Sequence, residues 1–254
     1  RGYNINQLAE HSTFEETGYL LIHGKLPTQA ELNDFDAELK AARELPEQVF
    51  DVLELVKDSH PMDALRTAVS ALASFDEDRN DNSPEATIRK GNRLTSQVPS
   101  IVMAHHNIRQ GKDPIKPSTV LNHAGNFLYM LNGDEPSAAT AELMDKDFVL
   151  HADHGSNASA FTARVVAGTA ADIHGAVTAG IAALSGPSHG GAAENVMQMA
   201  KEIGKPENAA DYVKNLLSNR ERVMGFGHRV YKAEDPRAGH LRAGVKKLSE
   251  EMGQ

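Results

Sequence analysis

The spacing of apolar residues constrains the fold of this chain more than any other feature. In nearly every segment they recur at intervals of three and four, which is the period of one face of an α-helix. Residues 62–75 follow this rule on one face, and a proline suited to a first helical turn comes before them: Pro61, then Ala64, Leu65, Ala68, Leu72 and Phe75. The alternation typical of strands is almost absent. We therefore predict an all-α, multi-helix fold.

The composition narrows the kinds of function. The 254 residues include 26 basic and 35 acidic side chains, and the resulting net charge of −9 argues against a general nucleic-acid-binding protein. The chain has no cysteine, which excludes disulfides, thiolate nucleophiles and cysteine-ligated metals. No apolar run reaches the roughly 18 residues of a membrane span, and no signal peptide opens the sequence. We expect a cytoplasmic protein that contacts no membrane.

Both ends of the sequence look interrupted. It opens on Arg1 rather than methionine, and its last residues, KKLSEEMGQ, keep the pattern of a helix. We expect the sequence to be a fragment of a longer polypeptide, although a complete domain freed from a tag has the same appearance.

Small and apolar side chains dominate residues 157–186, NASAFTARVVAGTAADIHGAVTAGIAALSG. The only titratable side chains among them are Arg164, Asp172 and His174. A helix that is apolar all round is buried on several sides, and small residues let neighbouring backbones approach closely. We predict a buried central helix, either in the core or at a subunit contact. By contrast, the polar residues 76–87, DEDRNDNSPEAT, predict a solvated loop.

Histidines gather in three motifs, of which the first is LHADHGSN at residues 150–157. His151 and His154 are three residues apart, so in a helix they share a face, with Asp153 beside them. Such a cluster is typical of a metal site, of a polar patch that binds an anionic substrate, or of hydrogen-bonded histidines that cap the helix starting near Asn157. The spacing alone leaves these three interpretations open.

The second motif is LSGPSHGGAAENVMQMA at residues 184–200. Gly186 and Pro187 end the preceding helix, and two glycines after His189 allow a sharp turn into the next one. His189 is therefore expected at a helix N-terminus, where free amide groups favour the neutral imidazole and make it a suitable donor to an oxyanion. A glycine-rich turn with an incidental histidine fits the same letters.

The third motif, VMGFGHRVYKAEDPRAGH, covers residues 223–240 and surrounds His228 with cations. Gly225 and Gly227 free backbone amides for phosphate or carbonyl oxygens. Asp235 and the following proline start the last helix, and Arg237 in its first turn opposes the helix dipole, so a bound anion explains it better than stability does. A solvated basic loop is the alternative. Together the three motifs suggest carbonyl chemistry on two substrates that carry carboxylates or phosphates.

In this order and at these separations, LHADHGSNAS, GPSHGG and MGFGHRVYKAEDPRAG resemble the citrate synthase family. The first residues, RGYNINQLAEHSTFEETGYLLIHGKLPTQAEL, are similar to the early helices of its shorter bacterial and archaeal type. The resemblance implies an all-helical homodimer with a large helical domain, which we assign to residues 1–190, and a smaller one, 191–254, that closes over the substrates. It also implies that acetyl-CoA and oxaloacetate condense to citrate and CoA.

The resemblance assigns roles to individual residues. His189 matches the histidine that hydrogen-bonds the thioester carbonyl and stabilises the enolate, and His228 the one that polarises the oxaloacetate carbonyl. His154 and Arg237 match the groups that hold carboxylates, with His151 and Asn157 in supporting places. The residues matching those around CoA are Met224, Gly225, Phe226, Gly227, Arg229 and Lys232. No metal and no cofactor is implied, because acetyl-CoA is a substrate.

The sequence departs from the family pattern in two ways. The general-base aspartate of the family, and further arginines, belong at positions after Gln254, so we assign no base. Ala193 stands where relatives commonly carry asparagine. The alternatives are a 2-methylcitrate synthase that uses propionyl-CoA, a lyase of the same fold, a metal-dependent hydrolase built on His151, Asp153 and His154, and a helical scaffold without chemistry.

Overall fold

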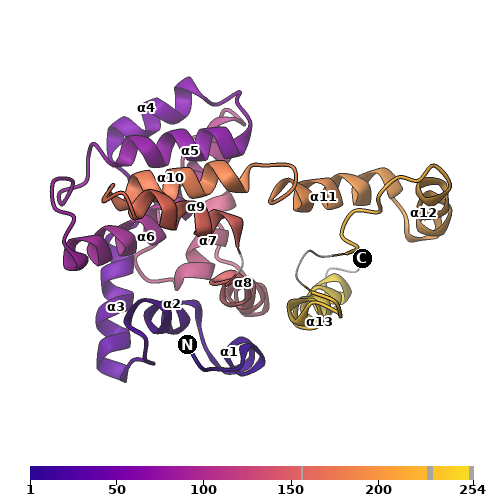
Figure 1. The fold of residues 1–254 in the computed structure, drawn as a ribbon, viewed down its shortest axis with the longest axis horizontal. Helices are drawn as coiled ribbons and strands as arrows, with labels where there is room; N and C mark the ends of the chain where they lie inside the picture. Colours follow the sequence, from indigo (N-terminus) through magenta and orange to yellow (C-terminus); the bar gives the residue numbers. More distant parts are fainter. Residues whose placement is uncertain (156, 228–230, 252–254) are drawn as a thin grey trace.

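The computed structural model describes residues 1–155, 157–227 and 231–251, and throughout these the regular structure is helical (Figure 1). The first helices are α1 (Ile5–His11), α2 (Phe14–His23), α3 (Gln29–Ala41), α4 (Glu47–Leu55), α5 (Pro61–Leu72), α6 (Pro84–Ile108) and α7 (His123–Asn132). They are followed by α8 (Ala138–His151), α9 (Ala158–Ala167), α10 (Ile173–Leu184), α11 (Gly191–Ile203), a short 3₁₀ helix (Pro206–Asn208), α12 (Ala209–Ser218) and α13 (Pro236–Glu251). The all-α prediction is confirmed.

Helices α4, α5, α6 and α10 enclose the main apolar core. Its buried members lie at helical spacing on α4, α5 and α6, and α10 contributes one residue: Val49, Leu53, Ala68, Val69, Leu72, Leu94, Ile101, Ala104, Ile108 and Ile181. Helix α5 begins at Pro61 and ends at Leu72, as its pattern predicts. Phe75 lies beyond its end and is 42% exposed. Removal of these side chains from water is the main force that holds the body together.

Most helix starts are fixed by a side-chain cap. Thr28 accepts from the Glu31 amide, and the Glu31 carboxylate accepts from the Thr28 amide, so the two form a capping box. Ser83 precedes Pro84 at the start of α6, and its hydroxyl accepts from the amide of Ala86. These residues satisfy the first amide groups of each helix, which have no partner inside it.

The small-residue segment 157–186 forms two helices, α9 and α10, rather than the single buried helix expected. Helix α9 stops at Gly168, and the Asp172 side chain then caps α10 by accepting from the Gly175 amide. Helix α10 packs against α5, α6 and α9 and buries His174, Ala176, Gly180 and Ile181. Helix α9 buries no residue, so the expectation of burial holds for one half of the segment only.

The polar residues 76–83 form a loop that is largely exposed, as expected, whereas residues 84–87 belong to α6 instead of the loop. The loop is nevertheless tied to α6 by ion pairs. Asp76 is 7% exposed and accepts from the Arg93 guanidinium at 2.6 Å, and Asp78 accepts from the same group at 2.7 Å. The ammonium of Lys90, fully buried, donates to the carbonyl of Asp81 and the side chain of Asn82. The acidic side chains therefore neutralise cations of α6.

Beyond α10 the chain leaves the main body. Helices α11 and α12 extend away from it, and α13 returns to pack against α8 and α1 (Figure 1). In this described portion of the chain, α11 and α12 bury no residue. The division into domains 1–190 and 191–254 stays a prediction. No helix among the described residues is both long and apolar enough to cross a membrane.

Candidate active site

The second motif forms a tight turn between α10 and α11. The Gly186 carbonyl accepts from the amides of His189 and Gly191, at 2.9 and 3.3 Å, and the Leu184 carbonyl accepts from Gly190. A Cβ at Gly190 would lie 2.5 Å from that Leu184 oxygen, so only glycine fits there. His189 thus lies directly before the N-terminus of α11, as the sequence predicts.

The imidazole of His189 is held by a residue that sequence reasoning missed. Nε2 of His189 lies 2.9 Å from Oγ of Ser159, in the first turn of α9, and the tautomer of the ring decides which atom donates. Helix α9 packs closely against α10 here: Gly180 of α10 faces the Ser159 carbonyl, and a Cβ there would be in van der Waals contact at 3.4 Å. Only the pairing of α9 with α10 brings Ser159 to His189, and the sequence gives no direct signal for it.

The first motif does not form the shared helical face expected for its two histidines. Helix α8 ends at His151, so His154 lies beyond the helix. Nδ1 of His151 is 2.9 Å from the Asp147 carbonyl and 3.2 Å from an Asp147 carboxylate oxygen. The hydrogen bond to the Asp147 side chain raises the pKa of His151 above its ordinary value, while burial and the nearby Arg237 act to lower it. This favours the imidazolium.

Arg237 lies in the first turn of α13, as expected from the Asp-Pro pair. Asp235 accepts from the guanidinium Nε at 3.0 Å and from NH2 at 2.7 Å, and it also accepts from the backbone amide of Arg237. The carboxylate therefore offsets the unfavourable place of a cation at a helix N-terminus and fixes the direction of the guanidinium. Asp235 therefore positions Arg237.

An aromatic contact joins the first motif to the third. The rings of His154 and Tyr231 meet edge to face, with centroids 5.7 Å apart and planes at 85°. Helix α13 also packs on α8, and Arg237 lies close enough to His151 at the end of α8 to act on its pKa. Asn157, three residues later, caps α9 by accepting from the Ala160 amide at 2.9 Å. Its predicted supporting role in substrate binding is untested by this contact.

The glycine elbow of the third motif rests on α11. Gly225 and Gly227 have φ of +84° and +88°, which favour glycine. A Cβ at Gly225 would lie 3.1 Å from a methyl of Val196 on α11. The Phe226 ring is 78% exposed, Lys232 is exposed and Met224 is half-buried. His228 and Arg229, the remaining predicted residues of this motif, lie outside the described residues.

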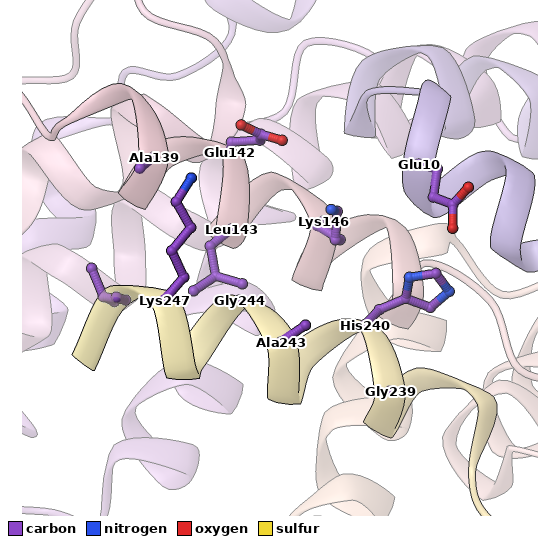
Figure 2. A pocket seen from close by; sticks show the side chains of 11 residues that line it. Glu10, Ala139, Glu142, Leu143, Lys146, Gly239, His240, Ala243, Gly244 and Lys247 are labelled. Carbon is purple, nitrogen blue, oxygen red and sulfur yellow. The ribbon is translucent and has the colours of Figure 1, made fainter. Parts of the chain in front are cut away.

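A groove of about 360 Å³ separates α8 from α13 where α1 approaches them (Figure 2). Leu143 points at Gly244 across its floor, and charged side chains stand around it: Glu10, Glu142, Lys146, His240 and Lys247. Among the described residues predicted for the site, none lines this groove. In the part of the chain that the structure describes, no three histidine or carboxylate groups converge as metal ligands.

Comparisons with known proteins agree with this arrangement. A family model described as "Citrate synthase, C-terminal domain" matches residues 1–254. "Citrate synthase 2" of Bacillus subtilis is 46% identical over 255 residues, which cover all of this chain and 68% of that protein. "Citrate/2-methylcitrate synthase" of the same organism is 37% identical over 255 residues, with the same shares of the two chains.

Among solved structures, a citrate synthase from Pyrobaculum aerophilum superposes with a TM-score of 0.93 and 38% identity, over 99% of this chain and 65% of its own. The present chain thus spans about two thirds of these relatives, in agreement with the expectation of a longer polypeptide. Because the family model and the curated relatives match across its whole length, the chain belongs to the citrate synthase family.

Proposed function

We propose that the protein containing this chain condenses acetyl-CoA with oxaloacetate and water to give citrate and CoA. The observation that carries the proposal is the match of all 254 residues to this family, with relatives named citrate synthase. The geometry supports it through His189, which is held before the N-terminus of α11. It also supports it through His154, in contact with Tyr231, and through Arg237, which Asp235 orients at the start of α13.

The proposed condensation requires each of these groups. Removing a proton from the methyl group of a thioester is difficult at neutral pH, so the enolate must be stabilised where its charge develops. An imidazole placed before the N-terminus of α11 suits that task, and the Ser159 contact keeps the ring in place. His154 and Arg237 would hold the carboxylates of oxaloacetate, since a guanidinium supplies both charge and direction.

Release of CoA tests the proposal directly. The full-length protein is mixed with acetyl-CoA and with or without oxaloacetate, and free thiol is measured along with citrate. We expect thiol release only when oxaloacetate is present, with one citrate for each CoA. Thiol release that ignores oxaloacetate, or no release at all, would contradict a citrate synthase.

A second candidate is the condensation of propionyl-CoA to 2-methylcitrate. It is favoured by the name of one relative, "Citrate/2-methylcitrate synthase" of Bacillus subtilis. The discriminating measurement is kcat/KM for acetyl-CoA and for propionyl-CoA at saturating oxaloacetate. We expect acetyl-CoA to be preferred, and a strong preference for propionyl-CoA would replace the first proposal with the second.

We also propose that the protein is a homodimer and that α9 contributes to its interface. Helix α9 buries no residue in this chain, yet it presents Phe161 and Val165, which are 69% and 55% exposed. Exposed apolar faces of this kind are typical of protein contacts. Phe161→Asp in the full-length protein should raise the concentration at which dimers dissociate in sedimentation. Leu55→Asp, at an 86% exposed position on α4, is the matched control and should not.

The proposed reaction needs no resident metal or cofactor, and we place it in the cytoplasm. Treatment with a chelator should leave the rate unchanged, and cell fractionation should recover the protein in the cytosolic fraction. Stoichiometric zinc or iron that is lost on replacing His151, Asp153 or His154 would instead support the metal-dependent hydrolase.

A further inference from the structure

Tyr231 contacts one of the groups that the proposed function assigns to substrate carboxylates and lies near another. Its ring meets the imidazole of His154 edge to face, at 5.7 Å and 85°. Tyr231 also belongs to the surroundings of Arg237: the pKa of the guanidinium is raised mainly by the hydrogen bond to Asp235 and, to a smaller extent, by the ionised form of Tyr231. Tyr231 is half-buried, so it is packed into this junction rather than pointing into solvent.

The contact matters because an imidazole turns easily. The second side-chain torsion of histidine is broad, so packing must decide where the two ring nitrogens point. His154 lies beyond the end of α8, in a connecting segment whose backbone does not hold it as a helix would. An edge-to-face aromatic contact has a preferred geometry and therefore restricts the torsion.

We propose that Tyr231 is a positioning residue for oxaloacetate binding, which orients the imidazole of His154 toward a carboxylate while Arg237 approaches from α13. The proposal rests on the proposed function, because it names the ligand of the same site. The third motif would then have a second role besides supplying cations, because the ring of Tyr231 orients His154 of the first motif.

Two substitutions separate the ring from the hydroxyl. Tyr231→Leu keeps apolar volume but removes the aromatic edge, and Tyr231→Phe keeps the ring and removes only the hydroxyl. We expect Tyr231→Leu to raise the KM for oxaloacetate by about 3- to 10-fold, the size of an aromatic pair contribution, with kcat changed less than twofold. Tyr231→Phe should stay within about twofold of the wild type. Tyr212→Leu, an aromatic of α12 far from the first motif in the fold (Figure 1), is the matched control and should change neither constant.

A role confined to packing predicts another pattern. In that case Tyr231→Leu would lower the melting temperature, or it would reduce kcat and the affinity for acetyl-CoA along with the affinity for oxaloacetate. The ring–ring coupling is tested in a His154→Gln background, where adding Tyr231→Leu should have no further effect on the KM for oxaloacetate. If the two substitutions multiply instead, or if Tyr231→Phe weakens binding as much as Tyr231→Leu, the positioning role is wrong.

Calorimetry with oxaloacetate alone keeps this inference separate from the proposed function. Wild-type full-length protein should bind oxaloacetate, and Tyr231→Leu should bind it about 3- to 10-fold more weakly. If the wild type does not bind, the proposed function fails. If the wild type binds and Tyr231→Leu binds equally well, only the positioning role is overturned. Should Tyr231→Leu not fold, Tyr231→His supplies the test, because a smaller aromatic ring should retain part of the affinity.

Discussion

The His189 turn and the junction of His154 with Arg237 are built by different means. His189 is fixed by backbone hydrogen bonds within one short turn and by one neutral contact, to Ser159. The junction instead has one ion pair on each side, His151 with Asp147 at the end of α8 and Arg237 with Asp235 at the start of α13. The ring contact of His154 with Tyr231 joins the two sides. Neutral, locally held groups suit a hydrogen-bond donor to a developing charge, whereas ionic groups from two helices suit an anchor for a charged ligand. The two regions should therefore respond differently to substitution and to pH.

The largest difference should appear on removing His189. Because it would stabilise charge that exists only in the transition state, His189→Ala should lower kcat by about 10²–10³-fold. The KM for oxaloacetate should change by less than about threefold, since His189 is assigned to the thioester. Steady-state kinetics of the full-length protein provides both constants. A rise in the KM for oxaloacetate with kcat unaltered would mean that His189 serves to bind oxaloacetate and does not act in the chemical step.

Arg237→Ala should give the opposite pattern. It removes a cation assigned to a substrate carboxylate, so the KM for oxaloacetate should rise by roughly 30-fold or more, with a smaller loss in kcat. Arg242 lies on the same helix, is exposed and pairs with Glu234. Arg242→Ala is therefore the matched control and should leave the KM within about twofold. Equal effects of the two variants would mean that Arg237 acts only through the general charge of α13.

Ser159→Ala should affect the same catalytic step as His189→Ala, but by a smaller factor. It removes one hydrogen bond, so kcat should fall by about 3- to 10-fold with the KM for oxaloacetate nearly unchanged. Ser218→Ala, whose hydroxyl donates to the Asn215 carbonyl on α12, serves as the control. If Ser159→Ala instead changed only thermal stability, the serine would hold α9 to α10 without orienting the imidazole.

The sequence predicted the local parts of both regions well. Glycine and proline mark the His189 turn, and the Asp-Pro pair marks the start of α13, because these residues restrict or free the backbone where they stand. The prediction failed for features that depend on packing between residues far apart in the sequence. Nothing in LHADH signals that α8 stops at His151, and neither Ser159 nor Asp147 is recognisable before the helices are placed.

The two halves of residues 157–186 make the same point for the fold. Both are small and apolar, and their composition predicts burial for both. Helix α10 is covered by α5, α6 and α9, whereas α9 keeps an exposed apolar face with Phe161. Composition predicts that a face needs a partner, but not whether that partner lies in the same chain. The loop 76–83 is the converse case, because its polar composition predicts exposure, yet Asp76 is buried and pairs with Arg93 of α6.

The smallest expected effect is electrostatic and concerns the junction alone. Hydrogen bonding to Asp147 raises the pKa of His151 above its ordinary value of 6.5, so the ring stays protonated to a higher pH. The positive charge is complete below about pH 6.5 and is lost as the pH rises through the raised value. If that charge helps to attract oxaloacetate, the KM should increase over this range. Asp147→Asn should move the increase to lower pH and raise the KM near pH 7 by about threefold at most, because the half-exposed pair is screened by solvent.

Glu142→Gln, on the same helix, should not move the profile. A profile that is unchanged by Asp147→Asn would show that Arg237 and His154 alone supply the charge felt by the ligand.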